Sequence, residues 1–200
     1  MIKIIVFDIG GVLIKYDDRM YYKYLSRKHD IDSDAFFKAI SKYSEQVDAG
    51  KITTSQLEEK MSHAIGIPKS EIGYDKFFPN IAKPNRPVER LARKLSERYD
   101  IAVLSNVNKS RHTAVLNVVV DGKVFKHEFL SYKIGDIKPH LKVYRYMIKK
   151  LGVKPGEILF IDDKKENIDA AKRLGINGIV YQNIGQLERD VKRALGTARI

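Results

Sequence analysis

Five short apolar stretches along the chain have the length and composition of buried β-strands. The first is IKIIVF at residues 2–7, and the others lie at 100–106, 127–132, 157–163 and 177–182. Runs of this length that are rich in β-branched and aromatic residues are typical of strands covered on both faces. We therefore expect five strands within a buried sheet.

Amphipathic helical patterns separate most of these strands. Residues 86–99 carry apolar side chains at helical spacing behind Pro87, and proline suits the first turn of a helix. Two further patterns, at 140–152 and 165–175, flank the strand at 157–163, and each ends at a glycine. Strands that alternate with helices in this way predict the α/β fold class, with a parallel sheet covered by helices on both faces.

Residues 16–85 interrupt the alternation, because they contain several helical patterns and no convincing strand. In the first pattern, helical spacing places Tyr24 on the same face as Tyr21 and Leu25. We predict an all-helical insert directly after the first strand. The expected domain boundaries assign residues 1–15 and 86–200 to the core and residues 16–85 to the insert.

Composition places the chain among globular proteins with a heavily charged surface. It has 200 residues, of which 44% are hydrophobic and 31% charged, enough for one large domain or a domain with a small insert. There is no cysteine, no apolar run long enough to span a bilayer and no signal-peptide pattern, so we expect a cytoplasmic protein without a membrane partner. The bias toward Lys, Arg, Glu, Ile and Tyr suggests a thermophilic source.

The net charge of +12 is compatible with two kinds of partner. Nucleic acid is one, and small anions attracted to a solvated basic surface are the other. The basic residues are dispersed along amphipathic helices and mixed with acidic ones, and the sequence contains no nucleic-acid-binding motif. We therefore expect small anionic ligands and no nucleic acid.

Three of the predicted strands end in residues that can bind a metal or a phosphate. Asp8 ends the first, Ser105 and Asn106 end the second, and Asp162 and Asp163 end the fourth. Ligands of open parallel sheets bind beyond the carboxyl ends of the strands, so neighbouring strands would bring three carboxylates together. A hard cation would relieve their mutual repulsion, and an all-oxygen ligand set favours Mg²⁺.

A lysine beside such a metal site would suit phosphoryl transfer. The metal and the lysine would neutralise charge on the phosphoryl oxygens while a carboxylate attacks phosphorus. Lys138, in GDIKPH, is the candidate, because Pro139 restricts its backbone and so fixes the direction of its side chain. Lys133 is the alternative lysine. His140 is either a proton donor or a surface residue at a helix N-terminus.

Four motifs contain these residues, in a fixed order along the chain. They are VFDIGGVL, IAVLSN, GDIKP and LFIDDKKEN. With these motifs in this order and spacing, the sequence resembles the haloacid dehalogenase-like (HAD) hydrolase superfamily over essentially its whole length. The resemblance implies a Rossmann-like doubly wound core, and the insert after the first motif is similar to the helical cap of that family.

The resemblance also implies roles for individual residues. Asp8 matches the family nucleophile, which forms an aspartyl-phosphate intermediate, and Lys138 matches the lysine of the catalytic site. Mg²⁺ would be held by Asp8, the backbone carbonyl of Gly10 and Asp163, with Asp162 as a direct or water-mediated ligand. The groups implied to hold the phosphoryl oxygens are the amides around Ile9 and Gly10 and the side chains of Ser105, Asn106 and Lys138.

Gly10 departs from the family pattern. Most phosphatases of the family carry a second aspartate there, which protonates the leaving group, whereas Gly10 offers only backbone. The motif resembles a sugar-phosphatase-like branch that also lacks this aspartate. The sequence thus predicts a Mg²⁺-dependent phosphatase of a small phosphorylated metabolite, such as a sugar phosphate. The alternative is a weakly active or inactive phosphate-binding or interaction protein.

Some of these residues also have a structural interpretation. Asp163 and Glu166 have the spacing of a helix capping box. The pair at residues 10–11 could form a turn that needs a positive φ angle. Tyr16 and Tyr21 lie near the entrance of the insert and could touch the substrate.

Overall fold

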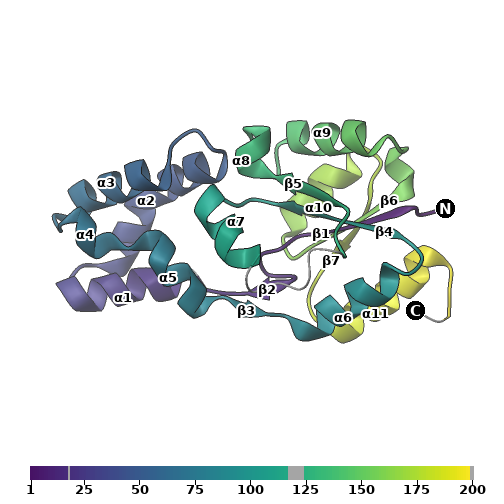
Figure 1. Ribbon diagram of the computed structural model, residues 1–200, viewed down its shortest axis with the longest axis horizontal. Helices are drawn as coiled ribbons and strands as arrows, with labels where there is room; N and C mark the ends of the chain where they lie inside the picture. Colours follow the sequence, from purple (N-terminus) through teal and green to yellow (C-terminus); the bar gives the residue numbers. More distant parts are fainter. Residues whose placement is uncertain (18, 117–123, 199–200) are drawn as a thin grey trace.

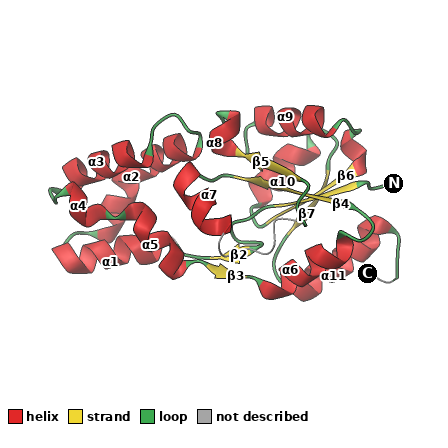
Figure 2. Ribbon diagram, in the orientation of Figure 1, coloured by secondary structure: helices red, strands yellow, loops and turns green. Residues whose placement is uncertain are grey.

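The computed structural model describes residues 1–17, 19–116 and 124–198. Within this part of the chain, one parallel sheet has the strand order β5-β4-β1-β6-β7 (Figure 2). Its strands are β1 (Ile4–Phe7), β4 (Asp100–Ser105), β5 (His127–Leu130), β6 (Ile158–Asp162) and β7 (Asn177–Val180). The five strands expected from the sequence are present, each shorter than its apolar stretch.

Helices cover both faces of this sheet, which makes the core doubly wound. Ile5 and Phe7 of β1 pack on one side, in a cluster with apolar residues of α6 and α11. Ile4 and Val6 pack on the other side with residues of α9 and α10. These helices are α6 (Arg86–Leu95), α9 (Leu141–Leu151), α10 (Lys165–Lys172) and α11 (Ile184–Leu195). Alternate residues of one apolar strand thus enter two different cores, and the α/β prediction is confirmed.

The helices α1–α5 form a separate group, the cap, at one end of the molecule, while the N-terminus and α11 lie near the opposite end (Figure 1). Tyr21, Leu25 and Ile40 belong to a hydrophobic core that these helices share. The helices are α1 (Arg19–His29), α2 (Ser33–Asp48), α3 (Thr54–Ile65), α4 (Lys69–Ile72) and α5 (Tyr74–Ile81). The expected all-helical insert is therefore present, with a core of its own.

The buried face of α1 differs from the one expected. Tyr22, and not Tyr24, is buried beside Tyr21 and Leu25, and Tyr24 is 47% exposed. The ring of Tyr22 packs edge-on against Phe36 of α2, with centroids 5.3 Å apart. Contact with α2 therefore decides which side of α1 is covered.

A short antiparallel ladder joins the cap to the core, and it was not expected from the sequence. It pairs β2 (Ile14–Lys15) with β3 (Lys83–Pro84). Beside it, Asn85 donates its backbone N–H to the Leu13 carbonyl at 2.8 Å and its side-chain amide to the Val12 carbonyl at 2.7 Å. These bonds hold the outgoing and returning segments side by side.

The cap also touches helices that follow strands of the core. The guanidinium of Arg111 lies over the Phe78 ring of α5, 4.8 Å from its centroid. The Ser131 hydroxyl donates to the carbonyl of Asp48, at the end of α2. The two core helices are α7 (Lys109–Leu116) and α8 (Ser131–Ile134). Because α7 and α8 follow the carboxyl ends of β4 and β5, the cap lies beyond this edge of the sheet.

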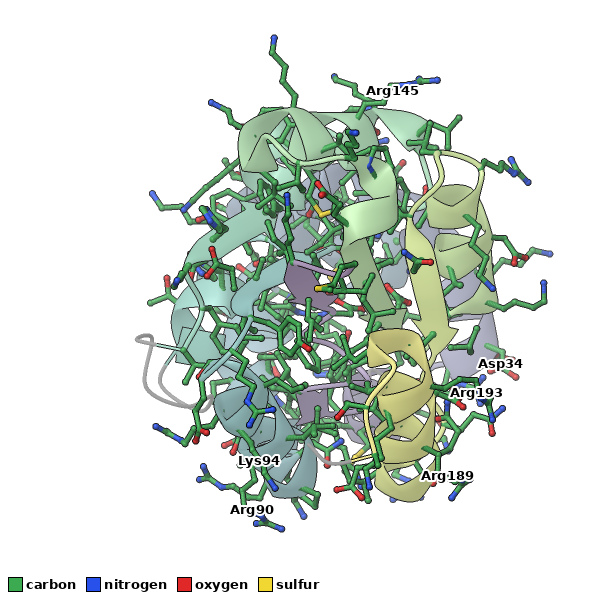
Figure 3. All side chains as sticks on the ribbon, turned by 90° about the vertical axis from the view of Figure 1, so that its right-hand side faces the viewer. Asp34, Arg90, Lys94, Arg145, Arg189 and Arg193 are labelled. Atoms are coloured by element: carbon green, nitrogen blue, oxygen red, sulfur yellow. The ribbon has the colours of Figure 1, made fainter. Side chains whose placement is uncertain are left out.

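The basic charge of the chain is spread over the outer helices. Figure 3 shows Arg90 and Lys94 of α6, Arg145 of α9, and Arg189 and Arg193 of α11 pointing outward. All five side chains are exposed. This arrangement fits the solvated basic surface expected from the sequence. No helix among the described residues is long and apolar enough to cross a membrane.

Candidate active site

A cavity of about 250 Å³ lies at the carboxyl ends of β1, β4 and β6. Asp8 follows β1, Ser105 is the last residue of β4, and Asp162 is the last residue of β6. Because these strands are parallel neighbours, their ends meet at one edge of the sheet. The residues that line the cavity are Asp8, Gly10, Gly11, Tyr16, Ser105, Asn106, Lys138, Asp163, Lys164 and Asn167.

Asp8 is a buried carboxylate with an exposed fraction of 7%. Its Oδ1 accepts the N–H of Ile9 at 2.6 Å and lies 2.9 Å from Nζ of Lys138. Burial raises the pKa of Asp8, Lys138 lowers it, and Asp162 raises it again, so that the pKa of Asp8 is raised to about 7. The site therefore holds more negative charge than its one buried ammonium group balances.

Lys138 is the buried cation of the site, with an exposed fraction of 3%. Its Nζ lies 2.9 Å from Asp8 Oδ1 and 2.6 Å from Asp162 Oδ2, and it donates to the Leu104 carbonyl at 2.9 Å. All three N–H groups of the ammonium therefore have partners within the protein. Burial lowers the pKa of Lys138, but the two carboxylates raise it above its ordinary value, so the side chain stays charged. The alternative lysine, Lys133, is exposed on α8.

Asp162 is fully buried, and both of its carboxylate oxygens accept hydrogen bonds from the protein. Oδ2 accepts from Lys138, and Oδ1 accepts the N–H of Lys164 at 2.8 Å. The side-chain amide nitrogen of Asn167 lies 2.9 and 3.0 Å from the two oxygens. Asp162 thus anchors Lys138 and the start of α10. Asn167 was not among the predicted site residues, although it is the last residue of the fourth motif.

The side chain of Asn106 holds the backbone of Lys138. Its Nδ2 donates to the Lys138 carbonyl at 2.9 Å, and its Oδ1 accepts the Lys138 N–H at 2.8 Å. The peptide bond between Lys138 and Pro139 is cis. Asn106 therefore lines the cavity while it positions the segment that carries the lysine.

The two glycines after Asp8 have different surroundings. Gly11 has a φ of 80°, and a Cβ atom there would lie 2.2 Å from Asp163 Oδ2, so only glycine fits against this carboxylate. Gly10 does not have a positive φ, but a Cβ atom there would lie 2.8 Å from the hydroxyl oxygen of Tyr16. The positive φ considered for this pair belongs to Gly11, and Tyr16 fills the space beside Gly10.

Three carboxylates are close enough together to hold a metal ion. One oxygen from each of Asp8, Asp162 and Asp163 lies within 4.8 Å of the other two. Asp163 is the exposed member of the cluster, and partial desolvation, together with the charge of Asp162, raises its pKa. Gly11 provides the room for Asp163 Oδ2. An all-oxygen, negatively charged cluster of this kind fits Mg²⁺.

The structure rejects the capping role considered for Asp163, and it places Tyr21 and His140 away from the cavity lining. Asp163 precedes α10 but supplies no capping bond to it, so the capping-box interpretation is wrong. The Tyr21 hydroxyl donates to the Ile72 carbonyl at 3.0 Å, inside the core of the cap. His140 pairs with Asp136 at 2.7 Å and stands at the N-terminus of α9, outside the cavity lining.

The capped parallel sheet and the carboxylate–lysine site suit a hydrolase in which a carboxylate attacks the substrate. A family model of haloacid dehalogenase-like hydrolases matches residues 2–175. The chain belongs to this family, as its four motifs indicated.

Two relatives with named activities are phosphatases. The chain is 26% identical over 203 residues to a D-ribitol-5-phosphate phosphatase of Bacteroides thetaiotaomicron. This alignment covers 92% of this chain and 93% of that protein. The chain is 25% identical over 184 residues to a sesquiterpene phosphatase of Aspergillus oryzae, covering 88% of each. The chain is thus related to phosphatases over most of its length, and the prediction of a phosphatase of this family is confirmed.

Solved structures have the same fold. A HAD family enzyme of Bacteroides thetaiotaomicron in its magnesium complex gives a TM-score of 0.81 at 24% identity, over 94% of this chain and 98% of that one. The same enzyme in complex with magnesium and inorganic phosphate gives a TM-score of 0.76 at 25% identity, over 91% of this chain and 95% of that one. An L-2-haloacid dehalogenase of Xanthobacter autotrophicus gives a TM-score of 0.67 at 20% identity, over 96% of this chain and 83% of that one. The predicted Rossmann-like core with a helical cap is confirmed.

Proposed function

We propose that this protein is a Mg²⁺-dependent phosphatase that hydrolyses a small phosphorylated metabolite, such as a sugar phosphate, through an aspartyl-phosphate intermediate. The observation that carries the proposal is the buried pair of Asp8 and Lys138, 2.9 Å apart, in a cavity that Asp163 also lines. A carboxylate there can act as a nucleophile, and the ammonium stabilises nearby negative charge. Similarity to a D-ribitol-5-phosphate phosphatase supports the substrate class.

The reaction has two halves, both at Asp8. In the first, an Asp8 oxygen bonds to phosphorus while the bond between phosphorus and the ester oxygen breaks. In the second, water attacks phosphorus, phosphate leaves and the carboxylate is restored. Lys138 holds Asp8 in position and balances its charge. Mg²⁺ held by Asp8, Asp163 and the carbonyl of Gly10 supplies, when bound, further positive charge beside the phosphoryl oxygens.

The groups around Asp8 divide between holding the phosphoryl group and holding the nucleophile. The Ser105 hydroxyl and the backbone of Gly10 border the cavity and hold phosphoryl oxygens. The Ile9 amide donates to Asp8 and orients it before it meets the substrate. Asn106 supports the site through Lys138. We assign Asp162 to anchoring Lys138, because its two oxygens already accept bonds from the protein.

The cap borders the substrate cavity. Tyr16 lines the cavity, and its ring packs edge-on against Phe78 of α5, with centroids 5.3 Å apart. We place the domain boundaries near the β2–β3 ladder, with residues 16–85 as the cap and residues 1–15 and 86–200 as the core. A cap in this position would exclude water and select the substrate.

We also place the protein in the cytoplasm of a thermophilic organism. The chain has no cysteine, and 31% of its residues are charged. Lack of cysteine is compatible with a reducing compartment, and dense surface charge favours ion pairs at high temperature.

Gly10 favours a second function, a phosphate-binding protein with little turnover. It offers no acid or base, and general acid–base catalysis typically contributes about 10²- to 10⁴-fold in rate. Turnover of p-nitrophenyl phosphate and of a panel of sugar phosphates, with Mg²⁺ and with a chelator, separates the two functions. Mg²⁺-dependent turnover supports the phosphatase. Calorimetric binding of inorganic phosphate without turnover of any ester would support the second function.

The two adjacent aspartates are expected to respond differently to substitution. Asp163→Asn should weaken Mg²⁺ binding at least about tenfold to hundredfold, because it removes charge from a ligand that faces the cavity. Asp162→Asn should instead lower the melting temperature, because it removes the nearer of the two charged partners of buried Lys138. Mg²⁺ titration by calorimetry and thermal melts check both. Equal and negligible effects of both substitutions on Mg²⁺ binding would mean that the metal does not bind at this edge of the sheet.

A further inference from the structure

The side of the cavity next to Gly10 is occupied by a hydroxyl group. The position that a Cβ atom of residue 10 would take lies 2.8 Å from Oη of Tyr16 and 2.9 Å from its Cε1. Both residues line the cavity with Asp8. Tyr16 thus brings an O–H group to the place where the backbone of the first motif lacks a side chain.

Neighbouring elements hold Tyr16 in this place. The residue directly follows β2, whose ladder with β3 fixes the backbone at the entrance to the cap. Its ring packs edge-on against Phe78, which in turn lies under the guanidinium of Arg111. Tyr16 is 36% exposed, so solvent and substrate can reach it, while the contact with Phe78 restrains the direction of its ring.

The other candidate proton donors are less suitable. All three N–H groups of Lys138 have partners within the protein. Asp17 accepts the N–H of Arg19 at 2.9 Å and, like His140, is not among the residues lining the cavity. Lys164 does line it, next to Asp163 in the sequence, and is the rival among the described residues that substitution tests.

We propose that Tyr16 is the proton donor to the leaving group, an inference that rests on the proposed phosphatase function. As the bond from Asp8 to phosphorus forms, the electron pair of the breaking P–O bond stays on the ester oxygen, which takes the Oη proton of Tyr16. Water then attacks phosphorus and returns a proton to the Tyr16 oxygen, while the Asp8–phosphorus bond breaks. The sum is ester plus water giving alcohol plus phosphate.

The role of Tyr16 also defines a substrate class. An alkoxide is a poor leaving group and needs a proton as it departs, whereas a nitrophenolate largely does not. A hydroxyl placed for this purpose therefore indicates esters of sugars or other aliphatic alcohols as the substrates of the site.

Tyr16→Phe keeps the ring against Phe78 and removes only the O–H group. We expect kcat/KM for alkyl phosphates to fall roughly 10²- to 10⁴-fold, and that for p-nitrophenyl phosphate to fall far less. The measurement is a series of phosphate esters of increasing leaving-group basicity, for which the variant should give a steeper decline than wild type. Tyr24→Phe, which removes a phenol hydroxyl from an exposed position of α1, is the matched control and should follow wild type.

Gly10→Ala provides a second test, which leaves the Tyr16 hydroxyl in the protein but displaces it. The added Cβ atom would lie 2.8 Å from the hydroxyl, so the phenol must shift. The same steepening of the leaving-group series is expected. This variant keeps the inference open to test if Tyr16→Phe does not fold.

The outcomes separate this inference from the proposed function. Wild-type turnover of both ester classes, with selective loss of alkyl turnover in the Tyr16 and Gly10 variants, supports the role of Tyr16. Equal loss on both classes, or a steepening caused by Lys164→Met instead, overturns that role and leaves the phosphatase standing. If wild type hydrolyses neither class with Mg²⁺, the proposed function is wrong and the role of Tyr16 falls with it.

Discussion

Replacing Asp8 with asparagine is expected to abolish phosphatase turnover, with a loss on the order of 10³-fold or more, as for other residues that make the covalent bond to substrate. An amide oxygen is a poor nucleophile and carries no charge for the metal. The fold should survive, because the amide oxygen of the new side chain can still accept from the Ile9 amide and from Lys138. Turnover of the best ester in the panel, with Mg²⁺ saturating, is the measurement.

Although Asp8→Asn should lose its turnover, we expect it to be more stable than wild type. Burial raises the pKa of Asp8 to about 7 in the folded protein, above its value in the unfolded chain. Ionising Asp8 therefore costs more free energy in the folded state, and above pH 7 this cost lowers the stability of wild type. Asp8→Asn should therefore melt at a higher temperature than wild type in metal-free buffer above pH 7. Asp169→Asn, on the exposed surface of α10, is the matched control. Full turnover in Asp8→Asn would exclude the aspartyl-phosphate route.

The sheet and the convergence of polar residues at its edge could be predicted from the sequence for a physical reason. Strands buried on both faces are apolar throughout, so the first polar residue marks the strand end, as Asp8 does after β1 and Asp162 at the end of β6. Parallel strands place these ends at one edge. The polar residues at the ends of the apolar stretches therefore predict where the site lies.

Other features depend on contacts that no local pattern contains. The β2–β3 ladder has two residues in each strand, too few for a periodic signal. Tyr22 and Tyr24 fit a helical stripe equally well, and only the packing of α2 decides between them. Asn167 could be assigned only when the direction of α10 brought its amide to both oxygens of Asp162.

The glycine pair shows the same limit at the site itself. Both glycines looked alike in sequence, yet Gly11 needs its left-handed backbone and its closeness to Asp163, while Gly10 is limited by a tyrosine six residues further along the chain. An aspartate placed at position 10 would meet Tyr16 before it met a substrate. An aspartate at position 10 could therefore reach a substrate only if the Tyr16 side chain shifted or were removed.

Lys138→Met is expected to destabilise the protein by about 3–5 kcal/mol, because it leaves the buried carboxylates of Asp8 and Asp162 without their shared cation. For a chain of this size, a loss of this kind lowers the melting temperature by roughly 6–20 °C. Methionine is close to the stem of lysine in volume, so the loss reflects charge and hydrogen bonds more than packing. Thermal and denaturant melts measure it, and phosphatase turnover should disappear with it.

Lys133→Met is the matched control, since it removes an exposed lysine five residues away and should melt with wild type. The double variant Lys138→Met with Asp8→Asn closes a mutant cycle. Because the second change removes one of the two stranded carboxylates, the double variant should be more stable than Lys138→Met alone, while turnover stays absent. Saturating Mg²⁺ should likewise raise the melting temperature of Lys138→Met more than that of wild type, since a bound cation replaces part of the missing charge. A Lys138→Met protein that melts with wild type would mean that the carboxylates do not depend on this lysine, and the charge balance assigned to the site would be wrong.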